Sequence, residues 1–148
     1  MPEALNYAQF KALLPVLALI TWTLVVWLWV MLTRIPTMQR EKIHPQKGKY
    51  TDQLADLLPE KVRNVSDNYN HLHEQPTLFY ALAFFLALGG GYDNVNVALL
   101  WGYVIIRIMH SFIQATINIV VYRFYAFVAS SICLFVIVIR ELIRIFLI

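Results

Sequence analysis

The stretch "LLPVLALITWTLVVWLWVMLT", residues 13–33, decides the class of fold. It contains 21 residues and no charged side chain. A helix of this length crosses about 30 Å, which is the thickness of the hydrocarbon layer of a membrane. A cleaved signal sequence would have a shorter apolar region and a small-residue cleavage site, so the stretch predicts a permanent membrane span.

The composition extends this interpretation to the whole chain. Its 148 residues are 59% hydrophobic and 14% charged, and the mean hydropathy is +0.60. Soluble domains have about 45–50% apolar and about 25% charged residues. We therefore expect a single integral membrane domain over residues 1–148. The net charge of +3 is concentrated in one segment, which indicates membrane topology rather than nucleic-acid binding. The only cysteine, Cys133, provides no partner for an internal disulfide.

Further apolar segments predict an all-α membrane protein with four transmembrane helices. We place the spans at about 12–33, 63–91, 97–122 and 124–146, with a polar loop at about 34–62. The second span has only about 15 consecutive apolar residues, so its helix must begin inside the polar stretch "DNYNHLHEQPTLFY", residues 67–80. Pro76 is expected to kink that helix. Because the last three spans are joined by short connections, an antiparallel bundle is expected.

The basic residues predict the orientation of the bundle. Seven of the twelve Lys and Arg residues lie between Arg34 and Arg63, whereas the turn "GGGYDNVN" at 89–96 has none. Cytoplasmic loops are enriched in Lys and Arg, so the long loop is expected in the cytoplasm and both termini outside. Arg140 and Arg144 count against this orientation but are fewer. Arg123, expected at the end of the third span, would then lie on the cytoplasmic side.

Two sets of polar residues each lie on one face of a predicted helix. The set on the second span falls within an arc of about 60° and comprises Arg63, Asp67, Asn70 and Glu74. The set on the third span falls within about 80° and comprises Arg107, His110, Gln114 and Asn118. A charged side chain facing lipid costs at least ~2.5–3.5 kcal/mol. We therefore expect the two polar faces to meet each other, or to meet another subunit.

Several roles are compatible with such polar faces. They can supply hydrogen bonds between helices, each contributing about 0.6 kcal/mol, or they can form a ligand site. A three-ligand metal site at His71, Glu74 and His110 is a further alternative, although the sequence lacks the HExxH motif and any His pair at i, i+4. We do not predict a metal site, and keep it only as an alternative hypothesis.

The spacing R-x2-H-x12-R, formed by Arg107, His110 and Arg123, resembles a motif of the MAPEG family, the membrane-associated proteins in eicosanoid and glutathione metabolism. The likeness covers nearly the whole chain, including the four spans and the basic first loop. The segment "HLHEQPTLFY", residues 71–80, is similar to the second helix of diverged bacterial members. Gln114 stands where the family has a tyrosine, and the family's second-span motif is present only in pieces.

The resemblance implies a fold, a cofactor and an assembly. It implies a homotrimer in contact with membrane lipids, placed in a bacterial inner membrane with its sites on the cytoplasmic side and between subunits. Arg123 would stabilise the thiolate of glutathione, the implied cofactor. The residues implied to bind glutathione are Arg63, Asn70, His71, Glu74, Arg107 and His110.

Three functional hypotheses follow. The first is a glutathione transferase or glutathione-dependent peroxidase that acts on a hydrophobic small-molecule electrophile. The second is a non-catalytic membrane protein of the same fold that binds a lipid or small molecule, which the altered second-span motif and Gln114 favour. The third is a metal or proton site at His71, Glu74 and His110.

Overall fold

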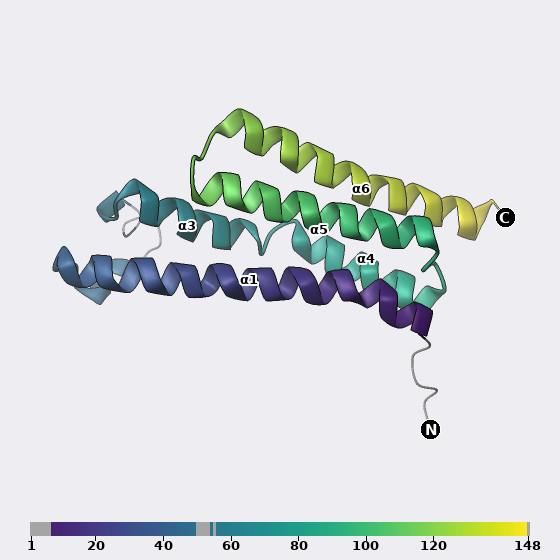
Figure 1. The fold of residues 1–148 in the computed structure, drawn as a ribbon, viewed down its shortest axis with the longest axis horizontal. Coiled ribbons are helices and arrows are strands. Elements are labelled where there is room, and N and C mark those ends of the chain that lie inside the picture. Colours follow the sequence, from purple (N-terminus) through teal and green to yellow (C-terminus); the bar gives the residue numbers. More distant parts are fainter. Residues whose placement is uncertain (1–6, 50–53, 55, 148) are drawn as a thin grey trace, which may run out of the picture.

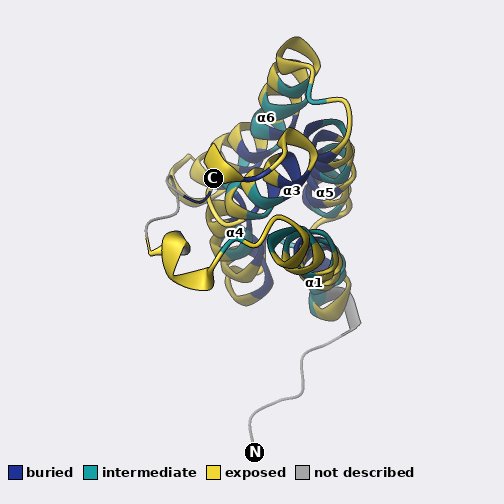
Figure 2. Ribbon diagram, turned by 90° about the vertical axis from the view of Figure 1, so that its left-hand side faces the viewer, coloured by how far each residue is buried: buried dark blue, intermediate teal, exposed yellow. Residues whose placement is uncertain are grey.

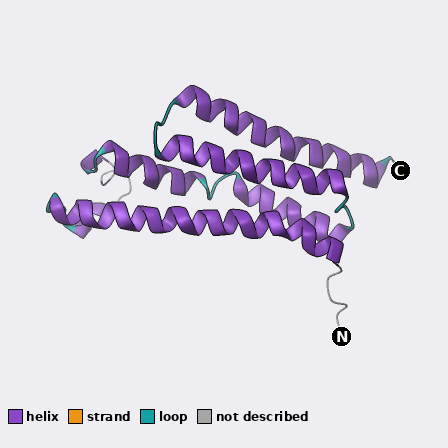
Figure 3. Cartoon of the chain, in the orientation of Figure 1, coloured by secondary structure: helices purple, strands orange, loops and turns teal. Residues whose placement is uncertain are grey.

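The computed structural model describes residues 7–49, 54 and 56–147. Its elements, in chain order, are α1 (Tyr7–Arg40), the short 3-10 helix η1 (Pro45–Gly48), α3 (Glu60–His71), α4 (Pro76–Gly89), α5 (Asn94–Ala115) and α6 (Val120–Phe146). Figure 1 shows that α1, the α3–α4 pair, α5 and α6 run in alternating directions along one long axis. Figure 3 shows no strand in the part of the chain that is described. The predicted all-α antiparallel bundle is confirmed.

Three helices have the length and composition of membrane spans. They are α1 from Gln9 to Arg40, α5 and α6. Large apolar side chains cover much of their outer surfaces, as Leu32 (74% exposed) and Phe135 (67% exposed) illustrate. Figure 2 shows exposed residues along much of the outside of the bundle and buried residues toward its centre. A surface this apolar is stable in lipid rather than in water, so the chain is an integral membrane protein.

The second predicted span is built from two helices instead of one. α3 ends at His71 and α4 begins at Pro76, and together they occupy the place of one span beside α1 and α5 (Figure 1). Proline at the first position of a helix sacrifices no internal hydrogen bond, because that N–H has no partner within the helix. Pro76 therefore starts a new helix, where a kink within a continuous helix was expected.

The ends of two other helices differ from the prediction. α1 continues past Thr33 to Arg40 and contains Pro36 within its length. α5 ends at Ala115, so Arg123 lies in the first turns of α6 and not at the end of the third span. Asn118, expected on the polar face of the third span, lies in the turn between these helices. The first turns of α6, which include Arg123, lie at the same end of the bundle as α3 (Figure 1).

The core joins apolar side chains from every long element. Its members include Val26, Phe79, Leu86, Leu100, Tyr103 and Ile137, all fully buried. The rings of Phe79 and Tyr103 stack with centroids 4.7 Å apart, which fixes α4 against α5. Offset aromatic pairs of this kind contribute about 0.5–1.5 kcal/mol beyond their burial.

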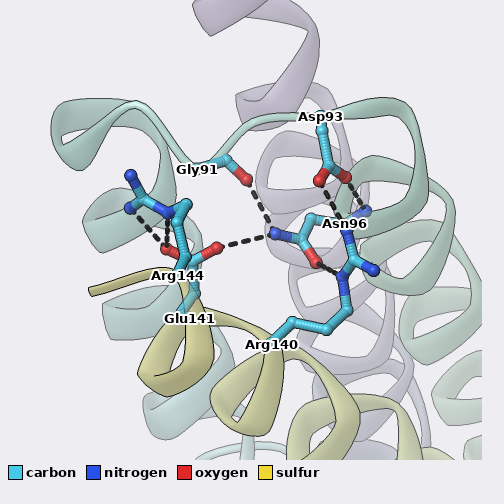
Figure 4. Close-up of polar contacts among 6 residues, drawn as sticks. All are labelled: Gly91, Asp93, Asn96, Arg140, Glu141 and Arg144. Carbon is cyan, nitrogen blue, oxygen red and sulfur yellow. Dashed lines mark hydrogen bonds and ion pairs between the residues drawn. The ribbon is translucent and has the colours of Figure 1, made fainter. Parts of the chain in front are cut away.

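A network of hydrogen bonds and ion pairs lies at the end of the bundle that is far from Arg123, where α6 ends (Figure 4). Asn96 is central: its Nδ2 donates to Glu141 Oε1 (2.9 Å) and to the Gly91 carbonyl (2.8 Å), while its Oδ1 accepts from Arg140 Nε (2.9 Å). Arg140 also pairs with Asp93 at 2.6 Å. The network holds the last turns of α6 against the turn between α4 and α5.

The same network explains why α6 continues through charged residues to Phe146. Glu141 is almost fully buried and accepts two hydrogen bonds from Arg144, at 2.9 and 2.6 Å. Arg144 also donates to the carbonyl of Gly89 at 3.1 Å. Because the charges are paired with one another and with the turn, α6 continues through them to Phe146.

Candidate functional site

Arg107 lies at the centre of the candidate site. Its side chain is fully buried in α5, and its NH2 group donates to the backbone carbonyl of His71 at 3.1 Å. Its Cζ lies 5.6 Å from the centroid of the Phe127 ring on α6, within the range of a cation–π contact. A buried charge is costly unless it is compensated, so each of these contacts matters to the stability of the site.

The break between α3 and α4 provides the acceptor that Arg107 uses. The last carbonyls of a helix have no partner within the helix, and the partial negative charge of the helix C-terminus attracts cations. Since α3 stops at His71, its C-terminal carbonyls face α5 at the level of Arg107. The polar residues before Pro76 therefore have a structural role. They end α3 at a point where the carbonyl of His71 can accept a hydrogen bond from the buried Arg107.

His71 connects Arg107 to an acidic group. His71 Nδ1 lies 2.6 Å from Glu74 Oε2, and His71 Nε2 lies 3.5 Å from Arg107 NH1. Arginine can only donate, so Nε2 is the acceptor and the proton belongs on Nδ1, where it is donated to Glu74. Glu74 is two-thirds exposed, so its carboxylate is accessible from outside the chain.

A second histidine lies beside this chain of contacts. His110 on α5 is buried, and its ring centroid is 4.9 Å from that of His71. Phe127 covers the other side of His71, with centroids 5.8 Å apart. Arg123 is close enough for its charge to act on both histidines. The structure thus brings together His71, Glu74, Arg107, His110 and Arg123 at one end of the bundle.

Arg123 is held by the turn that precedes α6. Its NH1 donates to Asn118 Oδ1 at 2.7 Å, and Asn118 Nδ2 donates to Asn64 Oδ1 on α3 at 2.8 Å. The Nε atoms of Arg123 and Arg107 are both buried, and neither has a hydrogen-bond partner among the described residues. Two arginines therefore retain donors that a bound anion can use.

Three predicted residues of the second span lie away from this cluster. Arg63 and Asp67 are about half exposed and pair with each other at 3.6 Å, and Asp56 lies 3.5 Å from Arg63. Asn70 is also exposed. Within the single chain, these residues form an outer face of α3 and do not meet Arg107. They remain candidate ligand residues only for a neighbouring subunit.

The buried polar face of α3 is formed by other residues, which the sequence interpretation missed. Asn64 and Asn68 are buried, and Asn68 Nδ2 donates to Ser111 Oγ at 2.6 Å. Trp22 Nε1 also donates to Ser111 Oγ, at 3.0 Å, which ties α1 to the same point. The spacing of Asn64, Asn68 and His71, at i, i+4 and i+7, was the available signal.

The metal hypothesis gains no support from the geometry. Within residues 7–49, 54 and 56–147, no group of three or more His, Cys, Asp and Glu residues is placed to hold a metal ion. His71 and Glu74 are instead hydrogen-bonded to each other.

The fold and the site define an α-helical integral membrane protein with a cationic, histidine-containing cluster at one end of its bundle. Comparison with known protein families matches residues 12–143 to the MAPEG family. Because the match covers nearly the whole chain, the protein belongs to this family, as its sequence motifs predicted. Comparisons with curated proteins and with solved structures gave no significant match. Membership makes the chain a membrane protein of the family of glutathione and eicosanoid metabolism.

Proposed function

We propose that the protein is a glutathione-dependent transferase or peroxidase that acts on a hydrophobic electrophile. The observation that carries the proposal is the pair of arginines, Arg107 and Arg123, whose buried Nε donors have no partner among the described residues. Glutathione carries two carboxylates, an amine and a thiol. Arginine suits carboxylates because its planar group donates two parallel hydrogen bonds.

The roles of the cluster follow from the charges and their exposure. Arg123 would stabilise the thiolate, because a cation beside a thiol favours its ionised form. Glu74 would bind the amine, since its carboxylate is exposed and already oriented by His71. Arg107 and His110 would line the inner wall. Each role uses a group that the structure places at the same end of the bundle.

The proposed assembly is a homotrimer, with sites between subunits that face the cytoplasm of a bacterial cell. Support comes from the outer face of α3, where Arg63 and Asn70 are exposed in the single chain. Polar groups near the hydrocarbon layer favour a protein partner over lipid. In a trimer this face would contribute to the cofactor site of a neighbouring subunit.

The test is a titration of the bound glutathione thiol. Thiolate absorbance in the ultraviolet is followed against pH for the protein in nanodiscs, after calorimetry has established glutathione binding. The wild-type thiol is expected to have a pKa well below its ordinary value of about 8.5. Arg123→Ala should raise the pKa of the bound thiol by roughly 1–3 units, and Arg123→Lys should restore part of the effect, because it keeps the charge but loses the planar geometry.

Two further variants separate the roles. Glu74→Gln should weaken glutathione binding more than it changes the thiol pKa. Arg40→Ala is the matched control, because Arg40 is a strongly exposed arginine at the same end of the bundle, and its ion-pair partner among the described residues is its neighbour Glu41. Glutathione that binds with an ordinary thiol pKa would contradict the proposed activity.

A second candidate function is non-catalytic binding of a lipid or apolar small molecule. It is favoured by a groove of about 510 Å³ between α4 and α6. The groove is lined mainly by apolar side chains, including Leu78, Leu82, Phe85, Leu134 and Phe135. Calorimetry distinguishes the candidates: this second function is supported if an apolar ligand binds and glutathione does not.

A further inference from the structure

Asn118 has an unusual backbone conformation in the turn between α5 and α6. Its φ angle is +49°, in the left-handed region. Asparagine is one of the few non-glycine residues that adopt this conformation readily, because its short polar side chain can form local hydrogen bonds. The conformation lets the side chain of Asn118 contact α3 on one side and α6 on the other, through Asn64 and Arg123.

The donors and acceptors in the hydrogen bonds among Arg123, Asn118 and Asn64 are fixed by their chemistry. Arg123 can only donate, so Asn118 must present its Oδ1 to the guanidinium. The Nδ2 group of Asn118 is then directed to Asn64, which must accept through its own Oδ1. The charge of Arg123 thus orients both amides, and the two amides in turn fix one side of the guanidinium.

The Nε atom of the Arg123 guanidinium is in a different environment from NH1. The Nε atom of Arg123 is buried and has no acceptor among the residues that the structure describes. Asn64 is itself buried, with 7% exposure, so water competes little for its bond to Asn118. One edge of Arg123 is therefore held by the protein, and its Nε remains available for an anion.

We propose that Asn118, oriented by Asn64, positions the Arg123 guanidinium beside the glutathione thiol. The inference rests on the proposed function, which assigns Arg123 to the thiolate. Asn118 and Asn64 are positioning residues, because they act through Arg123 and do not touch the reacting sulfur. The hydrogen-bonded series Asn64–Asn118–Arg123 also joins α3, which carries His71, to α6. It thereby sets the distance between the two parts of the site.

The side chain of Asn118 can be removed without changing its backbone. Glycine adopts positive φ without strain, so Asn118→Gly keeps the turn and deletes both hydrogen bonds. Asn64→Leu removes the acceptor from the α3 side, and Asn64→Asp restores an acceptor oxygen. Thr116→Ala is the matched control, because Thr116 lies in the same turn and is exposed, and within the described part of the chain its hydroxyl donates to the carbonyl of Phe112 in α5.

Three measurements are made on each variant of the full chain in nanodiscs. They are the pKa of bound glutathione thiol, the dissociation constant for glutathione, and the rate at which a dicarbonyl reagent modifies Arg123 in the absence of glutathione. Asn118→Gly and Asn64→Leu should raise the thiol pKa by roughly 0.5–1 unit, a part of the roughly 1–3 units that an adjacent cation supplies. Glutathione affinity should change less than threefold, and modification of Arg123 should become several-fold faster.

The outcomes separate this inference from the proposed function. Thr116→Ala should behave as wild type in all three measurements. Asn64→Asp adds a negative charge, so its readout is the rate of Arg123 modification, which should match that of wild type. A thiol pKa in Asn118→Gly that equals the wild-type value, or an unchanged rate of Arg123 modification, contradicts the positioning role alone. An ordinary thiol pKa in the wild-type protein contradicts the proposed function instead. Helical circular dichroism of each variant establishes that a loss does not come from unfolding.

Discussion

Replacing Glu141 with glutamine should destabilise the bundle, because Glu141 is the buried acceptor of the network at its far end. The side chain is 6% exposed and accepts two hydrogen bonds from Arg144 and one from Asn96. Glutamine has the same size, but it is neutral, and its amide nitrogen would face groups that are themselves donors. The change therefore removes a charge and leaves donors without acceptors.

The size of the effect follows from the exposure of the partners. Hydrogen bonds to a charged group contribute about 1.5–3 kcal/mol each. Arg144 is 41% exposed, so water can replace much of the hydrogen bonding that Arg144 loses. Asn96 keeps its hydrogen bond to the carbonyl of Gly91. We expect a net loss of about 2–3 kcal/mol. At about 2–4 °C for each kcal/mol in a chain of this length, the melting temperature should fall by roughly 5–10 °C.

The assay is thermal unfolding in detergent micelles, followed by circular dichroism. Glu41→Gln is the control, because Glu41 forms an ion pair that is 48% exposed on its side and 72% exposed on that of Arg40. Exposed pairs contribute little, so this variant should lose no more than about 0.5 kcal/mol. If Glu141→Gln melts within the range of the control, the network does not hold α6 in place.

A second variant tests the same contact from the other side. A Cβ atom at Gly91 would lie 2.5 Å from Glu141 Oε2, closer than real Cβ contacts allow. Gly91→Ala should therefore displace the carboxylate and destabilise the protein in the same direction. In the double variant with Glu141→Gln the two effects should be less than additive, because both act on the same contact.

Two predictions concern pH and topology. The backbone N–H of Asn96, and then Arg140, lower the pKa of Asp93, so its stabilisation is complete above the unfolded value of about 3.9 and is lost as pH falls through the lower folded value. Asp93→Asn keeps a good helix cap, and its melting temperature should depend less on pH than that of wild type between about pH 2 and about pH 5, a range that includes the unfolded value of about 3.9. Lys47→Cys, in a Cys133→Ser background, should resist an impermeant thiol reagent applied outside intact cells, because the basic loop is expected in the cytoplasm. Efficient labelling there would reverse the orientation.

The sequence predicted the fold well because the dominant force is simple. Long apolar segments such as residues 13–33 must become helices in lipid, where each backbone group needs an internal partner. The helix ends were harder to predict. Pro76 fits both a kink and a first helical position, and only the acceptor that Arg107 needs makes the break before it favourable.

The arrangement of the candidate site within one chain was predicted in part, and the remaining difference has a geometric cause. Arg107 and His110 were placed correctly toward the second span, because a buried arginine on a membrane helix has few alternatives. On α3 the face chosen was the one with charges, Arg63 and Asp67. Charges at the end of a span can reach water or headgroups, whereas the neutral amide of Asn68 cannot leave the interior without losing its bond to Ser111. Amides were the better signal for the buried face.

The arginines at the two ends of the bundle have different partners, and this difference supports the proposed function. At the far end, Arg140 and Arg144 each have an acidic partner at 2.6 Å, so their charges stabilise the fold. At the other end, Arg107 and Arg123 are bonded only to neutral groups, and both keep a buried Nε without a partner among the described residues. A protein that needed these two arginines for stability alone would be expected to pair them with carboxylates, as it does at the far end. Their lack of acidic hydrogen-bond partners is what the proposed binding of an anionic cofactor would require.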